Sequence, residues 1–395
     1  MQTNTKPSLR VLICVRRLDR GGAEMLECRL ARELSSMGIK ADLACQYSPQ
    51  MEGQQEAAAR WLDEGVPAVQ WLKMDGIQGI AKSIGLLRHL MQQYDLTLTS
   101  THGTDIAASW ARMGTVSPHV VALHGIPTDV TMKHLRLRVW KHSLKRVDQF
   151  YSISDYIRQQ AWKKLGVPLE RNQTIYNSID LNRLHPIEDR VGIRKKLGLP
   201  GDSKVLIYVG RIMESKGCGL LVNALASKLK EWNAYLVMVG PVYTEKGLEP
   251  GSLSYDMVLN QKIAYSPAPD RIKLTGWCDD VGSMMASSDV LVHLSQHEGF
   301  GLILLEAMAA GLPVVASNVG GMPEVLNGTP YTPVPLDDYE AIQHEIQRWL
   351  SMDQPTLQRY TEQAKQRLDY YTDRRRAEDI LRVFESVLSR RARLS

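Results

Sequence analysis

Short apolar segments that alternate with helix-like segments are the feature that most limits how this chain can fold. One series of such segments precedes Asn177 and a second series follows it. The runs are LRVLICV (9–15), KADLAC (40–45), LTLTS (96–100), HVVALH (119–124) and QFYSIS (149–154), then KVLIYVG (204–210), AYLVMVG (234–240), RIKLTG (271–276), DVLVHLS (289–295) and PVVASN (313–318). Buried runs of this length separated by helices are typical of strands in parallel sheets that are covered on both faces.

Two series of strands predict an α/β protein with two doubly wound, Rossmann-like domains. The length of 395 residues agrees, because a single core rarely grows beyond about 250–300 residues. The break falls near IYNSIDLNRLHP (175–186). We therefore predict a first domain over 1–177 and a second domain over 178–373.

Composition excludes several classes of protein. The chain is 44% hydrophobic, and none of its apolar runs approaches the roughly 20 residues of a membrane-spanning helix. The N-terminal MQTNTKPSLR lacks the apolar core of a signal peptide. The five cysteines are odd in number and scattered, which argues against a disulfide framework and against a zinc site: Cys14, Cys28, Cys45, Cys218 and Cys278. We expect a soluble, cytoplasmic protein.

The charge of the chain is distributed unevenly. Up to Asn177 there are 23 Lys and Arg against 16 Asp and Glu, whereas the remainder holds 25 against 27. A basic first half suggests an anionic partner there, such as a membrane surface or a phosphorylated acceptor. An evenly solvated surface is an equally good explanation. No nucleic acid is expected among the partners.

Unusual residues lie directly after two of the predicted strands, where ligands collect in parallel sheets. Arg211 and Lys216 follow KVLIYVG, so two cations stand five positions apart in a strand-to-helix loop. Gly299 and Gly301 follow DVLVHLS and precede the helical run LILLEAMAAG. Glycines allow close approach of the backbone, and free N–H groups at a helix start bind anions. Together these groups could hold a diphosphate without a metal, and the chain contains no Asp-x-Asp sequence.

Two glutamates flank the same glycine loop. Glu306 falls in the second turn of the predicted helix, where a carboxylate can accept hydrogen bonds from a vicinal diol such as that of ribose. Glu298 precedes the glycines, within reach of hydroxyls on whatever the diphosphate carries. Each residue alone is more often an ordinary surface charge. Their combination, in register with the strand ends, favours a functional site.

The stretch EGFGLILLE, followed by AMAAGLPVVAS, resembles the signature of the family 4 retaining glycosyltransferases. Further matching motifs cover nearly the whole chain: Gly-Gly-Ala-Glu (21–24), Val-Gly-Arg…Lys-Gly (209–217), Leu-Thr-Gly-Trp (274–277) and Gly-Gly-Met-Pro-Glu-Val-Leu (320–326). The resemblance implies the GT-B fold, in which two Rossmann-like domains face each other across a cleft. The last helix of the family crosses back to the first domain, and RRRAEDILRVFESVL (374–388) resembles that helix, so 374–395 would complete the first domain.

The resemblance also implies roles for individual residues. Arg211 and Lys216 would hold the donor diphosphate, and Glu306 would bind the ribose hydroxyls. Glu298 would bind the donor sugar. The remaining donor-binding positions implied by the match are Gly21, Gly22, Gly276, Trp277, Gly299, Phe300, Gly301 and Leu302.

Three histidines lie within, at the end of or just after predicted strands. His124 matches the family histidine that faces the reacting sugar carbon, although a histidine bonded to local backbone would also explain it. His102 is undecided between function and structure, and His293, inside a strand run, is interpreted as structural. The loop Pro241-Val242-Tyr243 departs from the small residues of many relatives, so the donor stays open between a UDP- and a GDP-hexose.

Three other functions agree less well with the sequence. A nicotinamide dehydrogenase would need G-x-G-x-x-G after the first strand, and LDRGGAEM does not supply it. A sugar-nucleotide epimerase can share the architecture, but the spacing of Glu298 and Glu306 favours transfer. A non-catalytic sugar-nucleotide binding subunit could lose His124, which this chain retains. We therefore predict a retaining hexosyltransferase that needs neither a metal nor a cofactor. Its pathway would be the assembly of bacterial surface polysaccharide, such as lipopolysaccharide, or of glycolipid.

A basic segment in the first domain suggests where the acceptor binds. The stretch 128–150 contains six cations interleaved with apolar residues and with Trp140 near the boundary between the two: Lys133, Arg136, Arg138, Lys141, Lys145 and Arg146. As a helix it could lie on an anionic membrane, which would suit a lipid-linked glycan acceptor. An ordinary surface helix whose apolar side faces the core is the alternative.

Overall fold

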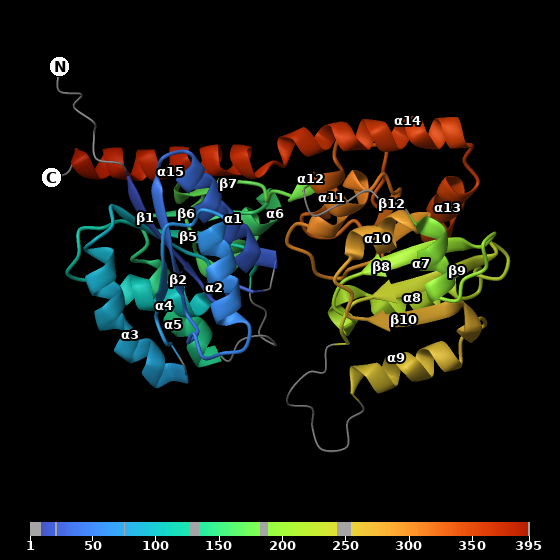
Figure 1. Cartoon of the computed structure of the whole chain (residues 1–395), viewed down its shortest axis with the longest axis horizontal. Helices are drawn as coiled ribbons and strands as arrows, with labels where there is room; N and C mark the ends of the chain where they lie inside the picture. The colour runs from blue at the N-terminus through green and yellow to red at the C-terminus, as the bar shows by residue number, and fades with distance from the viewer. Residues whose placement is uncertain are drawn as a thin grey trace. The chain divides into compact units, whose positions relative to one another are not determined.

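The computed structural model describes residues 9–19, 22–74, 76–126, 134–181, 189–242 and 254–393. The chain divides into two compact units, Met1–Ser178 with Thr372–Ser395, and Ile179–Tyr371. These boundaries lie within two residues of those read from the sequence. Each unit is an α/β domain with its own parallel sheet (Figure 1).

The first unit contains a seven-stranded sheet with the order β3-β2-β1-β4-β5-β6-β7, in which all neighbours are parallel. Its strands are β1 (Arg10–Val15), β2 (Lys40–Cys45), β3 (Val69–Trp71), β4 (Leu96–Thr99), β5 (His119–Leu123), β6 (Gln149–Ser152) and β7 (Asn172–Thr174). Its helices are α1 (Gly22–Ser36), α2 (Gln54–Asp63), α3 (Gly76–Met91), α4 (His102–Ala111), α5 (His134–Leu144), α6 (Asp155–Leu165) and α15 (Asp373–Ala392).

Strand β1 shows why this sheet is covered on both faces. Because successive side chains of a strand point to opposite faces, Val11, Ile13 and Val15 enter one core while Leu12 and Cys14 enter another. The first core is completed by α1, α2 and α15, and the second by α3 and α4. In Figure 1 the red helix α15 accordingly runs along the first unit, next to its blue elements.

The second unit contains a five-stranded parallel sheet with the order β10-β9-β8-β11-β12. Its strands are β8 (Lys204–Val209), β9 (Ala234–Val239), β10 (Ile272–Gly276), β11 (Val290–His293) and β12 (Val314–Ala316). Its helices are α7 (Arg190–Lys196), α8 (Cys218–Leu225), α9 (Tyr255–Ala264), α10 (Val281–Ala286), α11 (Leu302–Ala309), α12 (Met322–Leu326), α13 (Tyr339–Leu350) and α14 (Gln354–Lys365).

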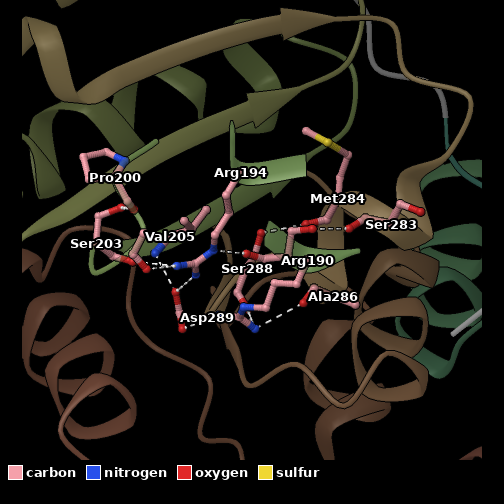
Figure 2. A network of polar contacts seen from close by, with 12 residues as sticks. Arg190, Arg194, Pro200, Ser203, Val205, Ser283, Met284, Ala286, Ser288 and Asp289 are labelled. Carbon is pink, nitrogen blue, oxygen red and sulfur yellow. Dashed lines mark hydrogen bonds and ion pairs between the residues drawn. The ribbon is translucent and has the colours of Figure 1, made fainter. Parts of the chain in front are cut away.

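A polar network fixes α7 to the amino ends of the strands in this unit (Figure 2). The buried guanidinium of Arg194 donates to the carbonyl oxygens of Ser287 and Ser203 and pairs with Asp289 at 2.7 Å. The same carboxylate accepts from the backbone N–H of Val205 and pairs with Arg190 at 2.8 Å. These contacts hold the edge of the sheet opposite to the one at which ligands would bind.

Candidate active site

The strand order of the second unit reverses between β8 and β11, since the chain continues from β8 to β9 on one side and from β11 to β12 on the other. Open parallel sheets bind ligands at the carboxyl ends of the strands where the order reverses. The segments that leave the sheet at this point are 210–217 and 294–301. They contain both predicted cations and the predicted glycine loop.

These two segments contact each other through their backbones. The N–H of Gln296 donates to the carbonyl of Ser215 at 3.1 Å. A Cβ atom on Gly217 would lie 1.8 Å from the carbonyl oxygen of Leu294, and the φ of Gly217 is 71°, so only glycine fits there. This close approach places Lys216 beside the segment that carries Glu298.

Lys216 and Glu298 form the centre of the site in the second unit. The Lys216 ammonium lies 2.7 Å from Oε2 of Glu298 and also donates to the carbonyl of His297 at 3.2 Å. Because an ammonium has three N–H donors, these contacts among the described residues use two of them. Nε2 of His293 lies 3.5 Å from the same carboxylate oxygen, and since a carboxylate only accepts, His293 is the donor.

The carboxylate of Glu298 is strongly held in its charged form. Burial alone would raise its pKa, but the hydrogen bond from His293 and the charge of Lys216 outweigh burial and lower that pKa from 4.5 to about 2. Glu298 therefore carries a full negative charge at neutral pH. It can accept hydrogen bonds from ligand hydroxyls while it partly neutralises Lys216.

His293, interpreted from the sequence as a structural residue within a strand, is the last residue of strand β11. The ring is buried and lies parallel to that of Tyr208, with 5.7 Å between the ring centroids. Tyr208 in turn donates to the carbonyl of Arg211 at 2.8 Å. The ring of His293 is therefore fixed in the core of the unit, where its Nε2 also contacts the carboxylate of Glu298.

The loop after β12 contacts the backbone carbonyl of Glu298. The motif that contains Gly320 and Gly321 was identified in the sequence, but this contact was not predicted. Gly321 donates its N–H to the carbonyl of Glu298 at 3.2 Å. Gly320 has φ 65°, and a Cβ atom there would lie 1.8 Å from the same carbonyl oxygen. The Gly-Gly pair is thus required where two backbones meet.

The predicted glycine loop opens helix α11. Gly301 is the residue before the helix, with φ 98°, and Leu302 is the first helical residue. Phe300 is buried, and its ring packs edge-on against Tyr371. Glu306 lies in the second turn of α11 and is half-buried. The backbone of Gly299, Phe300 and Gly301 and the side chain of Glu306 therefore flank one helix start.

The remaining predicted donor residues of the second unit lie on neighbouring loops. Arg211 is exposed and follows β8 by two residues. Gly276 ends β10 with φ 72° and accepts from Gly240 at 2.9 Å. Trp277 is 65% exposed, and its indole N–H donates to Asp279 at 2.7 Å. All of these positions lie at the carboxyl edge of the sheet.

Two further predicted positions belong to the first unit. Gly21 lies outside the described residues, and Gly22 begins α1. His124 follows β5 directly, and its Nε2 lies 2.8 Å from Oε1 of Glu27, a residue that the sequence analysis did not single out. Glu27 escaped notice because it stands inside an amphipathic helix, where glutamate is usually a surface residue.

The basic segment of the first unit corresponds in part to α5, and the structure corrects one expectation about it. Trp140, expected near the boundary of the apolar side, is 1% exposed. Its indole donates to Asp105 at 2.9 Å, and its ring packs edge-on against His102 at 4.3 Å between centroids. Trp140 is therefore a core residue. Lys133 lies outside the described residues.

Neither a metal cluster nor a membrane span is found in the part of the chain that the structure describes. There, no three His, Cys, Asp or Glu side chains are grouped as metal ligands would be. Within the same residues, no helix is both long enough and apolar enough to cross a bilayer.

Comparison with known families gives two matches that follow one another along the chain. Residues 20–183 match the family described as Glycosyltransferase Family 4, and residues 189–367 match Glycosyl transferases group 1. Each match falls within one of the two units of the structure, apart from a few residues at the boundary.

Individual proteins show the same similarity. N-acetyl-alpha-D-glucosaminyl L-malate synthase of Bacillus anthracis is 35% identical over 163 residues, 41% of this chain and 40% of that protein. Lipopolysaccharide core mannosyltransferase LpsB of Rhizobium meliloti is 31% identical over 193 residues, 48% of this chain and 50% of that protein. The chain thus spans half the length, or less, of these curated relatives.

Solved structures show the fold over a much larger part of the chain. The crystal structure of HepE of Anabaena in complex with UDP and glucose has a TM-score of 0.79 at 21% identity, covering 96% of this chain and all of that chain. At this identity the likeness concerns the fold, which is GT-B.

Proposed function

Because the chain belongs to the family 4 glycosyltransferases, we propose that it transfers a hexosyl group from a nucleotide diphosphate sugar to an acceptor hydroxyl with retention of configuration. The observation that carries this proposal is the pairing of Lys216 with Glu298 beside the start of α11. A cation for phosphate and a carboxylate for hydroxyls are then held at one strand-order reversal.

The donor would be bound in the second unit. Arg211 and Lys216 would contact the diphosphate together with N–H groups at the start of α11, where a helix attracts negative charge. Glu306 would accept hydrogen bonds from the ribose diol, and Glu298 from hydroxyls of the hexose. We favour UDP as the nucleotide, because structures of HepE contain UDP and UDP-glucose.

The reaction breaks the bond between the anomeric carbon and the diphosphate oxygen, and the electron pair leaves with the diphosphate. The acceptor oxygen forms the new bond on the same face, and its proton passes to a phosphate oxygen. Preorganised cations and N–H donors stabilise the charge that develops on the leaving group, and one such donor is worth about 3–4 kcal/mol. The resemblance of His124 to the family histidine supports a role for it at the reacting sugar.

Nucleotide binding in the presence of EDTA tests the donor and the proposed independence of metals together. We expect UDP to raise the melting temperature of the protein more than GDP or ADP does. Hydrolysis and transfer assays with UDP-hexoses would then identify the sugar. Binding of none of the three nucleotides would contradict the proposal. Activity that is lost with EDTA and restored by magnesium would contradict the metal-free part alone.

We also propose that the acceptor is a lipid-linked glycan, as in surface polysaccharide assembly, and that the enzyme contacts the inner face of the cell membrane. Helix α5 supports this with an outer face of exposed apolar and basic residues, Leu135, Arg136, Arg138 and Val139. The name of the relative LpsB refers to lipopolysaccharide core synthesis.

A cavity next to this helix would suit anionic lipid headgroups. It has a volume of about 570 Å³, and four of the side chains that line it are Arg138, Lys141, Lys145 and Arg171. Within the described part of the chain none of these four forms an ion pair. Each cation near an anionic bilayer contributes about 1 kcal/mol.

Co-sedimentation with liposomes tests the membrane contact. We expect salt-sensitive binding to anionic vesicles that Lys141→Glu with Lys145→Glu weakens. The control, Lys195→Glu with Lys196→Glu on α7, changes the net charge equally but at the second unit. If the protein sedimented with neither anionic nor neutral vesicles, the membrane contact would be contradicted and a soluble acceptor would be favoured.

A further inference from the structure

A carboxylate is buried inside the first unit at a place where an apolar residue would be expected. Glu27 lies on the face of α1 that packs into the domain, between the buried residues Leu26 and Cys28, and is 0% exposed. Burying an ion costs several kcal/mol unless partners compensate for the lost water. Glu27 therefore requires an explanation that packing alone does not give.

Three side chains from separate elements surround this carboxylate. Arg376 of α15 pairs with Oε1 at 2.7 Å, and the hydroxyl of Tyr151, in β6, donates to the same oxygen at 3.0 Å. Nε2 of His124, after β5, lies 2.8 Å from it. The buried cation balances the buried anion, so Glu27 remains charged, in agreement with a pKa of about 2 that burial opposes and Arg376 and His124 lower.

The need to join α1 to α15 does not account for the whole arrangement. Arg29 already pairs with Asp373 at 3.0 Å, and Arg376 donates to the carbonyl of Leu26 at 3.0 Å. Neither contact involves His124. Other contacts therefore already join α1 to α15, and what the carboxylate of Glu27 adds is a contact with His124.

Contact with a carboxylate fixes which nitrogen of His124 carries the proton. Because a carboxylate only accepts hydrogen bonds, the neutral ring must donate from Nε2, and Nδ1 becomes the acceptor. The side chain of His124 is 11% exposed and stands directly after β5, at the carboxyl edge of the sheet. One ring orientation and one tautomer are thereby selected.

We propose that Glu27 is a positioning residue that holds His124 in one orientation with the proton on Nε2, and that Arg376 keeps the Glu27 carboxylate in place. This proposal rests on the proposed function, in which His124 has a role in the reaction. It adds that Arg376, on helix α15, contributes to the reaction through Glu27 and His124.

The tautomer can be measured without any substrate, by nitrogen-15 NMR of histidine-labelled protein. In wild type we expect the His124 signals of a ring protonated on Nε2. Because Arg376, Tyr151 and His124 all contact the same oxygen of Glu27, a glutamine could keep its amide oxygen there, so the informative substitution is Glu27→Leu, which removes the acceptor. In Glu27→Leu we expect the ring of His124 to show a mixture of the two tautomers. A ring that stays wholly protonated on Nε2 in a folded Glu27→Leu variant would overturn the proposal, whether or not a substrate has been found.

Turnover provides the second readout once a donor is known. Glu27→Leu should lower kcat roughly 10- to 100-fold, as loss of a supporting contact commonly does, with little change in KM for the donor. In a His124→Ala background the same change should cause no further loss. Additive losses would show that Glu27 acts on the fold alone and would overturn the proposal.

The matched control is Asp373→Asn, which weakens the junction of α1 and α15 without touching His124. We expect this variant to lose stability while its tautomer and kcat remain those of wild type. If Glu27→Leu fails to fold because Arg376 is left unpaired, Glu27→Leu with Arg376→Leu removes the buried cation as well. A double variant that folds and keeps wild-type kcat would overturn the proposal.

Discussion

Lys216 and Glu298, 82 positions apart in the sequence, form an ion pair of 2.7 Å at the carboxyl edge of the second sheet. The pair is one-fifth exposed, so water and ligands can reach both charges. A diphosphate that approaches Lys216 must share it with Glu298. The carboxylate then limits how tightly the ammonium binds any anion, and it favours ligands that also offer hydroxyls.

Removal of the lysine should therefore affect catalysis strongly. Lys216→Ala is expected to lower kcat about 10²- to 10³-fold, because the departing diphosphate loses one of its stabilising donors. Steady-state kinetics with the donor identified by binding measures the effect. Lys262→Ala, in which the lost ammonium bonds Asn223 on the surface of the same unit, is the control. A loss of less than threefold would contradict the role of Lys216.

Substitutions of Glu306 and Glu298 should have different effects on binding of the nucleoside diphosphate. Glu306→Ala should weaken binding of the bare nucleoside diphosphate, since hydrogen bonds to a charged acceptor are worth about 1.5–3 kcal/mol. Glu298→Gln should leave that binding close to wild type and instead lower turnover and discrimination between hexoses. Calorimetry with UDP distinguishes them. If Glu298→Gln weakened UDP binding and Glu306→Ala did not, the roles assigned to the two glutamates would have to be exchanged.

The glycine pair after β12 predicts a sharp difference between two similar substitutions. Gly320→Ala places a Cβ atom 1.8 Å from the carbonyl of Glu298, whereas Gly198→Ala, at nearly the same φ of 64°, meets nothing within 4 Å. Both should lose about 1–2 kcal/mol from the left-handed backbone. Gly320→Ala should lose more free energy of unfolding and also turnover. Equal effects in urea unfolding and in kinetics would contradict the close contact.

Buried Asp105 predicts a dependence of stability on pH. Burial raises its pKa from 3.8 to about 7, although Thr99 and Trp140 donate hydrogen bonds to it. Between these two pH values the folded chain keeps a proton that the unfolded chain has released, so the free energy of unfolding falls as pH rises toward 7.

Asp105→Asn removes this contribution, so the variant should gain stability relative to wild type between pH 5 and pH 8. Urea unfolding followed by tryptophan fluorescence measures the difference, since Trp140 contacts residue 105 directly. A difference that stays constant over this range would show that Asp105 is charged in the folded protein.

The sequence predicted ten of the strands but missed the two at the edges of the first sheet. Val69–Trp71 and Asn172–Thr174 are three residues long, and each lies at one edge of the sheet, next to a single partner. An edge strand does not need an apolar run, because only one neighbour and partial burial stabilise it. Periodicity therefore carries little information about such strands.

Residues of the candidate site could be predicted from the sequence only where they directly follow a predicted strand. Lys216 and Glu298 follow strands and were selected for that reason, whereas Glu27 and Arg376 lie on helices α1 and α15. Their sequence neighbours give no sign that a buried ion pair joins positions 349 residues apart. His124 could be proposed from its motif, but its partner required the fold.

Helix α15 also has a consequence for the order in which the chain can fold. Ile380, Val383 and Phe384 belong to the first core, yet a ribosome synthesises them after the entire second unit. The second unit can complete its core during synthesis, whereas part of the first core stays uncovered until α15 has been made. Loss of the last 24 residues should therefore damage the unit that was made first, and leave the later one folded.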